Sequence, residues 1–299
     1  MSFIFKEFLM NHLKRLKNYL FGIVVFGFTS PAMAVDVDQE LEIIGVPIPD
    51  GINFQPSVTE VARDAIWLDN ILLVVGTLIV IFVLGLLLYV ILRFNASSNK
   101  TPSQTTHNTP LEILWTAIPI VILVGIGIIS LPILFKQQTI PEGDITIKAT
   151  GNQWYWTYEY MDHDFSFDSF MLDKSAVEDH GYTMDEYMLA TDQPVVIPVD
   201  TTIVVYVTAS DVIHAWTVPA FGVKQDGVPG RLAGLWFKAE KEGIYFGQCS
   251  ELCGKDHTYM PITVKVVSQE VYDDWIQRAV AEFAEVGDIK EEVLYASIP

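Results

Sequence analysis

The stretch Cys249-Ser-Glu-Leu-Cys-Gly-Lys-Asp-His-Thr-Tyr-Met260 contains both cysteines of the chain together with a histidine and a methionine. Thiolate and thioether sulfur suit copper, and imidazole nitrogen suits several first-row metals. The spacing of Cys249, Cys253, His257 and Met260 allows one loop to surround a small site from several sides. We therefore expect this loop to be a metal centre and the rest of the chain to serve as its scaffold.

The sequence on both sides of this loop predicts an all-β domain. Short runs rich in β-branched and aromatic residues are separated by turn residues such as Gly227 and Gly230, which is typical of an antiparallel sandwich or a Greek-key barrel. We expect this domain over residues 136–299, with an acidic insertion at 161–193 and a closing amphipathic helix near 269–286. The expected strands are residues 145–150, 154–160, 195–199, 203–208, 233–237, 243–247 and 262–267.

A further metal ligand has to come from outside the loop, and His214 is the best candidate because it follows the expected strand 203–208. Two histidines, two cysteines and one methionine exceed the needs of a tetrahedral zinc site, which also seldom uses methionine. Two thiolates that bridge two copper ions would use all five, if each ion had one imidazole and one weak axial ligand. The main-chain carbonyl of Glu251 would then be the second axial ligand.

Two other interpretations of the same residues stay open at this point. Cys249 and Cys253 would form a disulfide in an exported protein, although a loop this short gains little from closure and the disulfide leaves the His257 and Met260 spacing unexplained. Alternatively, the same side chains would hold a single copper ion, either as a mononuclear centre or as a copper-delivery site.

Two apolar segments predict a membrane hairpin. Residues 71–92 form an uncharged run whose helical length, about 33 Å, matches the hydrocarbon core of a bilayer. Residues 113–135 have the same character. Residues 93–112 between them carry Arg93 and Lys100, whereas the flanking segments are rich in acids, so we expect this loop in the cytoplasm and both ends outside.

The first residues of the chain have the pattern of a secretory signal. Residues 1–34 contain a basic stretch, a short apolar run and the small-residue sequence Ala32-Met33-Ala34, so we expect cleavage after Ala34. Residues 35–70 are polar and acidic, and we expect them to form an exported N-terminal arm.

The net charge of the chain argues against one class of partner and favours another. The formal charge is -19, which excludes binding to the phosphate backbone of nucleic acids. A field of this sign would attract a basic protein and accelerate its encounter in a salt-dependent way.

Taken together, these features resemble subunit II of the bacterial aa3-type cytochrome c oxidases, over nearly all of residues 35–280. The resemblance is carried by the two-helix hairpin and by Gln153-Trp-Tyr-Trp-Thr-Tyr-Glu159, His214, Cys249-Ser-Glu-Leu-Cys-Gly254, His257 and Met260.

The resemblance implies a cupredoxin-like domain with a dinuclear copper A centre, in the periplasm and anchored in the cell inner membrane. It implies that this centre receives electrons from cytochrome c and passes them to heme a in subunit I, where oxygen is reduced and protons are pumped. The hemes would lie only in subunit I, and the Glu251 side chain would bind a magnesium ion shared with that subunit. The implied copper ligands are His214, Cys249, the Glu251 carbonyl, Cys253, His257 and Met260.

The resemblance also implies roles for residues outside the copper loop. Trp154 would be the surface point at which the electron enters. Glu112 would lie at the cytoplasmic mouth of a proton channel, although a capping box beginning at Thr109 explains Glu112 without any transport role and is compatible with one. The acids that would dock cytochrome c are Glu159, Asp168, Asp179 and Asp211.

Rival classes of protein fit the sequence less well. A quinol oxidase subunit of the same fold lacks the copper ligands, which are all present here. The copper A domain of nitrous oxide reductase is soluble and accompanies a large domain for which this chain has no room. No Cys-x-x-Cys-His stretch is present, which argues against a fused cytochrome c.

Overall fold

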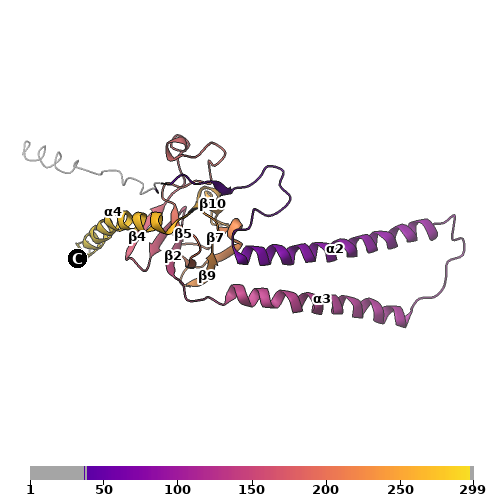
Figure 1. Cartoon of the computed structure of the whole chain (residues 1–299). Coiled ribbons are helices and arrows are strands. Elements are labelled where there is room, and N and C mark those ends of the chain that lie inside the picture. The colour runs from indigo at the N-terminus through magenta and orange to yellow at the C-terminus, as the bar shows by residue number, and fades with distance from the viewer. Residues whose placement is uncertain (1–36, 38, 297–299) are drawn as a thin grey trace, which may run out of the picture. The chain divides into compact units, whose positions relative to one another are not determined.

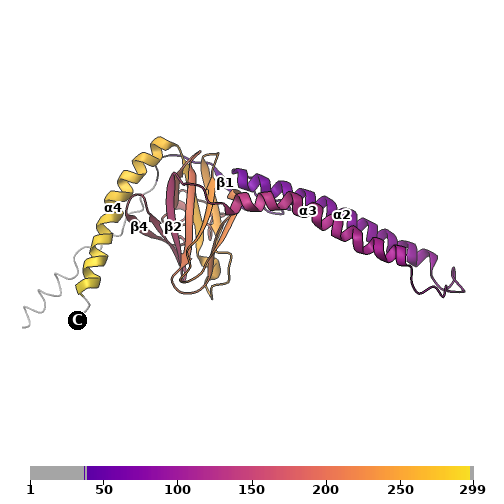
Figure 2. The same ribbon diagram turned by 90° about the horizontal axis from the view of Figure 1, so that it is seen from below.

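The computed structural model describes residue 37 and residues 39–296, with side chains described as far as residue 284. The signal peptide expected at residues 1–34 lies outside the described residues. Two sheets pack through one hydrophobic core to form the β-domain (Figures 1 and 2). One sheet has the strand order β1 (Ile43–Gly45), β10 (Gly243–Gln248), β11 (Pro261–Val267) and β5 (Val195–Pro198). The other has the order β4 (Phe165–Ser169), β3 (Tyr155–Tyr160), β2 (Ile145–Asn152), β6 (Thr202–Ala209) and β9 (Ala233–Lys238).

The expected sandwich is confirmed, and every run expected to be a strand is one. The expectation of purely antiparallel sheets is wrong, because β2 pairs with β6, β5 with β11 and β1 with β10 in parallel. Alternating side chains of β2 point into the core, so that Ile145, Ile147 and Ala149 are buried. Period-two alternation shows that a strand has a buried face, but it does not show which strand is its neighbour.

Two strands that the sequence analysis did not predict form a small separate sheet. β7 (His214–Val218) and β8 (Val223–Gly227) pair with each other around the short helix η2 (Pro219–Phe221). All five residues of β7 are buried. This buried hairpin places His214 inside the domain.

The insertion at 161–193 is more ordered than its acidic composition suggests. Besides β4 it contains η1 (Glu178–His180) and a bridge between Met171 and Thr191. Its apolar side chains Leu172, Val177 and Tyr182 form a second core with two residues of β10. The insertion therefore covers the outer face of the sheet that carries the metal loop.

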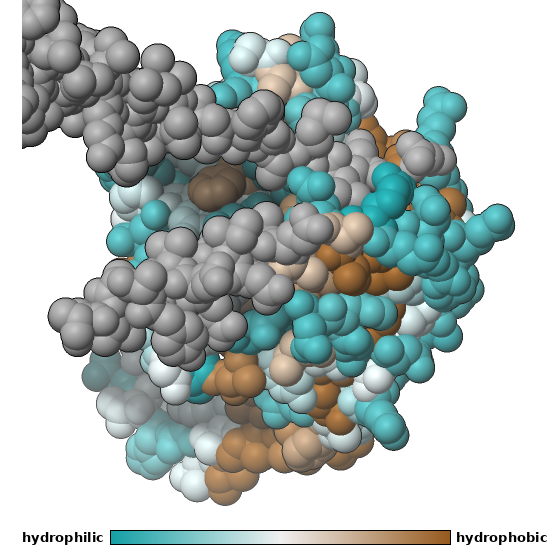
Figure 3. Space-filling view, turned by 90° about the vertical axis from the view of Figure 1, so that its left-hand side faces the viewer, coloured by the Kyte–Doolittle hydropathy of each residue, from teal (hydrophilic) through white to brown (hydrophobic). Residues whose placement is uncertain are grey.

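Two long helices, α2 (Glu60–Arg93) and α3 (Thr109–Gln138), run side by side (Figures 1 and 2). Both are long and apolar enough to cross a membrane, and their apolar side chains are largely exposed. The face of the β-domain seen in Figure 3 is instead mostly hydrophilic, with smaller apolar areas. The expected spans 71–92 and 113–135 lie within these helices, and each helix extends beyond its span at both ends.

The part of α2 that precedes the apolar span belongs to the β-domain, not to an extended arm. The N-cap residue Thr59 is fully buried, accepts a hydrogen bond from the Ala62 amide at 3.0 Å and donates one to the Phe221 carbonyl at 2.7 Å. Gly222 has a φ of +69°, and a Cβ there would lie 2.5 Å from the Cα of Ala62. β1 likewise lies in the expected arm, yet it pairs with β10.

Ion pairs join the start of α2 to the end of α3 and to the β-domain. Lys136 near the end of α3 contacts Glu60 at 2.6 Å and Asp64 at 2.7 Å. Arg63 forms a two-pronged pair with Glu240 of the β-domain, with both contacts at 2.7 Å. These pairs are partly exposed, so each contributes little alone, but they fix the register of the helix ends.

The start of α3 differs by one residue from the expected capping box. Asn108, not Thr109, is the N-cap, and its side chain accepts a hydrogen bond from the Leu111 amide at 3.3 Å. Glu112 returns the interaction by accepting from the Asn108 amide at 3.0 Å. The reciprocal cap was correctly expected, but Asn and Thr are both good N-caps and their order along the chain does not show which is used.

The closing helix α4 (Gln269–Ala296) is longer than the expected 269–286. Its residue Trp275 is 1% exposed and packs on the rings of Tyr160 and Phe165 at centroid distances of 5.4 and 6.2 Å. Phe283 extends this contact further along the helix, toward Phe165 and Phe167.

Replacing Trp275 with Ala should lower the free energy of unfolding of the β-domain by about 3–5 kcal/mol, because a large side chain leaves a cavity between α4 and the sheet. Thermal unfolding of the full chain in detergent, followed by near-UV circular dichroism, measures this. Gln277→Ala on the exposed face of the same helix is the control and should change little. Equal losses in both variants would show that α4 does not stabilise the sandwich.

Candidate metal centre

The metal loop begins where β10 ends and finishes where β11 begins. Cys249 follows the last residue of β10, the short helix η3 (His257–Tyr259) provides His257, and Met260 precedes Pro261 of β11. The Ser250 amide donates to the Ala215 carbonyl of β7 at 3.0 Å. This bond fastens the start of the loop to the strand that carries His214.

Three buried donor atoms meet in this loop. The ligand atoms of His214, Cys249 and Cys253 all lie within 4.8 Å of one another. Nδ1 of His214 is 3.8 Å from the Cys249 sulfur, and the two sulfurs are 3.9 Å apart. Both cysteines are free thiols, since a disulfide would place the sulfurs at about 2.05 Å. The structure thus contains a pair of thiols and no disulfide at this position.

The remaining predicted ligands surround the same two sulfurs. The Cys253 sulfur lies 3.4 Å from Nδ1 of His257 and 3.5 Å from the Met260 sulfur. The Glu251 carbonyl oxygen lies 3.4 Å from the Cys249 sulfur. The structure therefore brings together all six groups that the sequence analysis named.

His214 is held on its far side by a carboxylate. Its Nε2 lies 2.9 Å from Asp211, whose other oxygen accepts from the Gln153 amide at 2.7 Å. Such a contact leaves Nδ1 free to bind a metal and fixes the orientation of the ring. Asp211, predicted above to be a docking acid, therefore positions a predicted metal ligand.

Gly151 of β2 packs directly against the His214 ring. A Cβ at this position would lie 2.7 Å from Cγ and 2.8 Å from Cδ2 of the imidazole. Because His214 is fully buried, it has no room to move away. The need for glycine at 151 has no signal in the sequence, because only the fold brings β2 against β7.

Residues of the turn between β2 and β3 also form hydrogen bonds with the loop. The side chains of Gln153 and Trp154 both donate to the Cys253 carbonyl, at 2.8 and 3.3 Å. Gly254, with a φ of +128°, lies against the Trp154 ring, where a Cβ would be 3.0 Å from Cζ2. The half-buried Trp154 is thus hydrogen-bonded to the backbone of a predicted ligand residue. A second indole, that of the buried Trp156, donates to the Met260 carbonyl at 3.3 Å.

Burial and hydrogen bonding separate the acidities of the two thiols. Burial, together with the adjacent Cys249 sulfur, raises the pKa of Cys253 to about 12. Burial also opposes ionisation of Cys249, but hydrogen bonds with His214 and the backbone lower its pKa below the ordinary value. Burial disfavours the charged imidazole of His214, yet its contacts with Cys249 and Asp211 raise its pKa. Because metals bind thiolates, metal uptake here releases protons.

The other acids named as docking residues occupy different environments. Asp168 accepts a hydrogen bond from the Thr157 hydroxyl at 2.7 Å. Burial raises the pKa of Tyr155, and the charges of Asp168 and Asp211 raise it further. Glu159 pairs with Lys148 at 2.8 Å. Asp179 is exposed on η1 in the insertion. Of the four, Asp211 is bonded to the amide of Gln153, the residue before Trp154, and Asp168 lies opposite Thr157 of β3.

The donor set fits a soft metal. Two thiols, a thioether and two imidazoles are the ligands that copper prefers, and hydrogen bonds hold the His214 ring and the carbonyls of Cys253 and Met260. In contrast, Glu112 lies at the other end of α3 and takes no part in this centre.

Comparison with known proteins agrees with the family resemblance found in the sequence. Residues 145–267 match the family model "Cytochrome C oxidase subunit II, periplasmic domain", and residues 47–133 match "Cytochrome C oxidase subunit II, transmembrane domain". This chain belongs to the cytochrome c oxidase subunit II family. Cytochrome c oxidase subunit 2 of Cereibacter sphaeroides is 56% identical over 267 residues, covering 85% of this chain and 88% of that protein.

A solved structure is also similar to this subunit II chain. The periplasmic domain of subunit II of cytochrome oxidase from Bradyrhizobium japonicum is 49% identical, with a TM-score of 0.44, and covers 48% of this chain and 99% of that one. The family match makes the present chain a membrane protein with two spanning helices and a periplasmic β-domain, and a subunit of an oxidoreductase.

Replacing Gly151 with Ala should weaken copper binding by about 10–100-fold, the usual effect of disturbing a residue that positions a metal ligand. The added methyl group would displace the His214 ring. Copper content after dialysis against a graded chelator measures the effect, and the unfolding temperature of the metal-free variant reports on folding. Gly234→Ala, where a Cβ meets only the Tyr206 ring at 3.3 Å and Ile140 at 3.4 Å, is the control. Unchanged affinity in the Gly151 variant would mean that this packing does not position His214.

Proposed function

We propose that this subunit accepts electrons from a basic cytochrome c at a dinuclear copper A centre and passes them to heme a in subunit I. Oxygen would be reduced to water there, with coupled proton pumping. The observation that carries this proposal is the convergence of buried His214, Cys249 and Cys253 with His257 and Met260 in a family of cytochrome c oxidase subunits.

The residues that would hold the two copper ions are those that the structure brings together. Cys249 and Cys253 would hold the copper through thiolate sulfur, His214 and His257 through imidazole nitrogen, and Met260 and the Glu251 carbonyl as weaker ligands. When bound, such a pair takes up and releases one electron. The part of the protein is to keep the ligands fixed and dry, which the burial of His214, Cys253 and Met260 supports.

Trp154 is the residue that we propose to connect the partner surface with the centre. Its indole is partly exposed, and its Nε1 donates to the Cys253 carbonyl. The ring therefore reaches the Cys253 sulfur through one hydrogen bond and a few covalent bonds of a single residue. Nearby Leu252 is 78% exposed, which adds an apolar contact point for a docking protein.

A basic cytochrome would be steered to this surface by acids. Asp211 accepts from the amide of Gln153, the residue before Trp154, and Asp168 accepts from Thr157 of β3. Glu159 and Asp179 would act at longer range, since steering depends on the summed field more than on single pairs. The Lys255 ammonium lies 5.7 Å from the centre of the Trp154 ring, so the docking surface is not uniformly negative.

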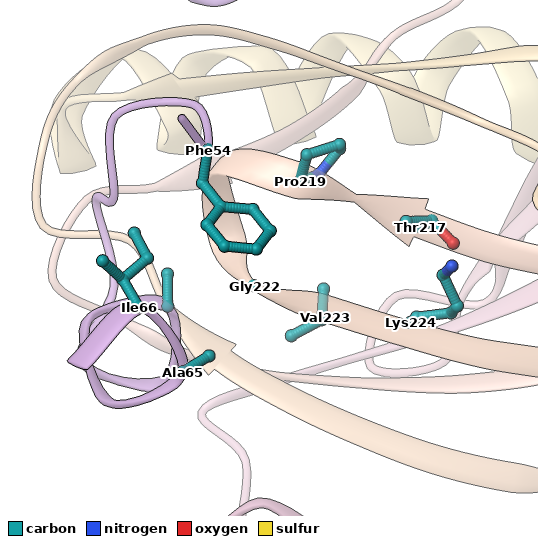
Figure 4. A pocket seen from close by; sticks show the side chains of 9 residues that line it. Phe54, Ala65, Ile66, Thr217, Pro219, Gly222, Val223 and Lys224 are labelled. Carbon is teal, nitrogen blue, oxygen red and sulfur yellow. The ribbon is translucent and has the colours of Figure 1, made fainter. Parts of the chain in front are cut away.

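We propose that subunit I meets the chain on the side of the membrane helices. Figure 4 shows a cleft there, lined by Phe54 and Ile66 on one side and by Thr217 and Lys224 of the β7–β8 hairpin on the other. The Thr217 hydroxyl is buried and has no hydrogen-bond partner among the described residues. A partner chain with an acceptor group would satisfy it and pair with Lys224.

Two further roles depend on subunit I. The main-chain carbonyl of Glu251 faces Cys249, whereas its side chain is exposed. The side-chain carboxylate would therefore be free to bind a magnesium ion shared with that subunit. Glu112 lies in the first turn of α3 and would collect protons at the cytoplasmic mouth of a channel. In the proposed orientation the two helices cross the cell inner membrane. The 93–112 loop would lie in the cytoplasm, and the N-terminus and the β-domain in the periplasm.

A copper-delivery protein is the second candidate function for such thiols. Delivery requires a site that releases its metal readily, whereas here the loop is held by Gln153, Trp154 and Trp156 from a separate strand pair. These contacts favour a resident metal.

Replacing Cys249 with Ser should abolish the electron paramagnetic resonance signal of one electron shared by two copper nuclei. The copper-loaded full chain should show this signal as a seven-line hyperfine pattern. Ser250→Ala, whose side chain is exposed, should keep it. Two coppers with the shared signal in the Cys249 variant would refute the dinuclear site, and a four-line pattern in the unaltered chain would favour a mononuclear or delivery role.

Replacing Trp154 with Phe should slow reduction by cytochrome c by roughly tenfold or more, because rates respond steeply to small losses of alignment between reacting groups. Copper content should not change. Stopped-flow reduction of the assembled oxidase measures the rate, and Tyr259→Phe, an exposed ring in the same loop, is the matched control. Normal kinetics in the Trp154 variant would reject this residue as the point of electron transfer.

A further inference from the structure

Trp156 of β3 contacts two of the predicted metal ligands and is not a ligand itself. Its side chain is fully buried. Its ring lies against the His214 imidazole, with a centroid distance of 6.0 Å and an interplanar angle of 63°, and its Nε1 donates to the Met260 carbonyl at 3.3 Å. One side chain therefore joins a ligand at the start of β7 to a ligand that precedes β11.

The register of the sheet explains why this indole reaches His214. Trp156 pairs directly with Gly151 of β2 in the antiparallel ladder. Residues opposite each other in such a pair share one face of the sheet. Because Gly151 has no side chain, it leaves space beside the indole, and the His214 ring fills that space. Gly151 and Trp156 thus form one continuous support for the site.

Met260 is the predicted ligand that depends most on its surroundings for its position. A methionine side chain has three rotatable bonds, and a thioether is a weak copper ligand. The Met260 side chain is 1% exposed, and its sulfur lies 3.5 Å from the Cys253 sulfur. The hydrogen bond from Trp156 holds the main chain of Met260, and so it limits where the sulfur lies.

We propose that Trp156 is a positioning residue that sets the reduction potential of the copper centre through its hydrogen bond to Met260. This inference rests on the proposed function and adds to it a residue that controls the potential. The potential of a copper site depends on its weak ligand, whereas such a ligand contributes little to metal retention. Without the indole N–H, the Met260 carbonyl loses this bond and the thioether is free to move away. Oxidised copper is then less stabilised, and the potential becomes more positive.

Trp156→Phe tests the proposal in the copper-loaded full chain in detergent. The substitution keeps an aromatic ring beside His214 and removes the N–H. A redox titration should give a more positive midpoint potential than in the unaltered chain, with the same copper content. Trp236→Phe is the matched control, because Nε1 of Trp236 also donates to a main-chain carbonyl, that of Lys136 near the end of α3, at 3.2 Å. Its potential should not change.

A double-mutant cycle shows whether Trp156 acts through Met260. Met260→Leu removes the thioether and should shift the potential in the same direction, at least as far as Trp156→Phe does. Adding Trp156→Phe to this variant should then cause no further shift, because the ligand on which the hydrogen bond acts is gone.

An unchanged potential in the Trp156→Phe variant would overturn the proposal. An equal shift in the chain that lacks the Met260 thioether would also overturn it, because the effect would then bypass Met260. Loss of copper or of the fold in Trp156→Phe would show that the hydrogen bond is structural and does not control the potential. If the unaltered chain lacks the signal of an electron shared by two copper nuclei, the proposed function itself fails, so the two failures are distinguishable.

Discussion

The contact between the His214 imidazole and the Cys249 sulfur is the constraint on which the predicted metal centre depends. It joins the first residue of β7 to the residue that follows β10, so both strands must be placed correctly before the donor atoms meet. Gly151 closes the other side of the ring, and Asp211 holds its second nitrogen. The geometry of the site is therefore a property of the whole sandwich. The loop provides most of the donor atoms, but the packing of the strands sets the distances between those atoms and His214.

The convergence of the loop's side chains could be predicted from the sequence because the four predicted ligands lie within twelve residues of each other. Soft donors at that spacing suit a copper centre and few sites of another kind. Because the loop needs one more ligand from elsewhere in the chain, the same argument identified His214 as a candidate. The supporting contacts could not be predicted. Gly151 and the donor pair Gln153 and Trp154 act across strand boundaries, and nothing in their local sequence shows what they face. Asp211 was identified as a surface acid, and only the fold shows that it also holds a ligand.

A similar limit applies to the fold. Strong periodic patterns predicted the strands and the two membrane spans, but weak local patterns hid β1, β7 and β8. β1 has three residues, and its pairing with β10 spans about two hundred positions of the chain. The beginning of α2 mixes charged and apolar residues, so a search for lipid-facing sequence misses it. Its apolar side chains Val61 and Ala62 are buried, which makes them core residues of the β-domain.

The continuity of α2 has a mechanical consequence. Its first turn is fixed by Thr59 and Gly222, and the same unbroken helix continues into the apolar span. An unbroken helix therefore connects the β-domain to the apolar span, with no loop between them. An electron carrier on a tether would find its acceptor by diffusion, at an effective concentration set by linker length. Under the proposed function, a carrier mounted on a membrane helix would instead have its transfer distance fixed when the subunits assemble.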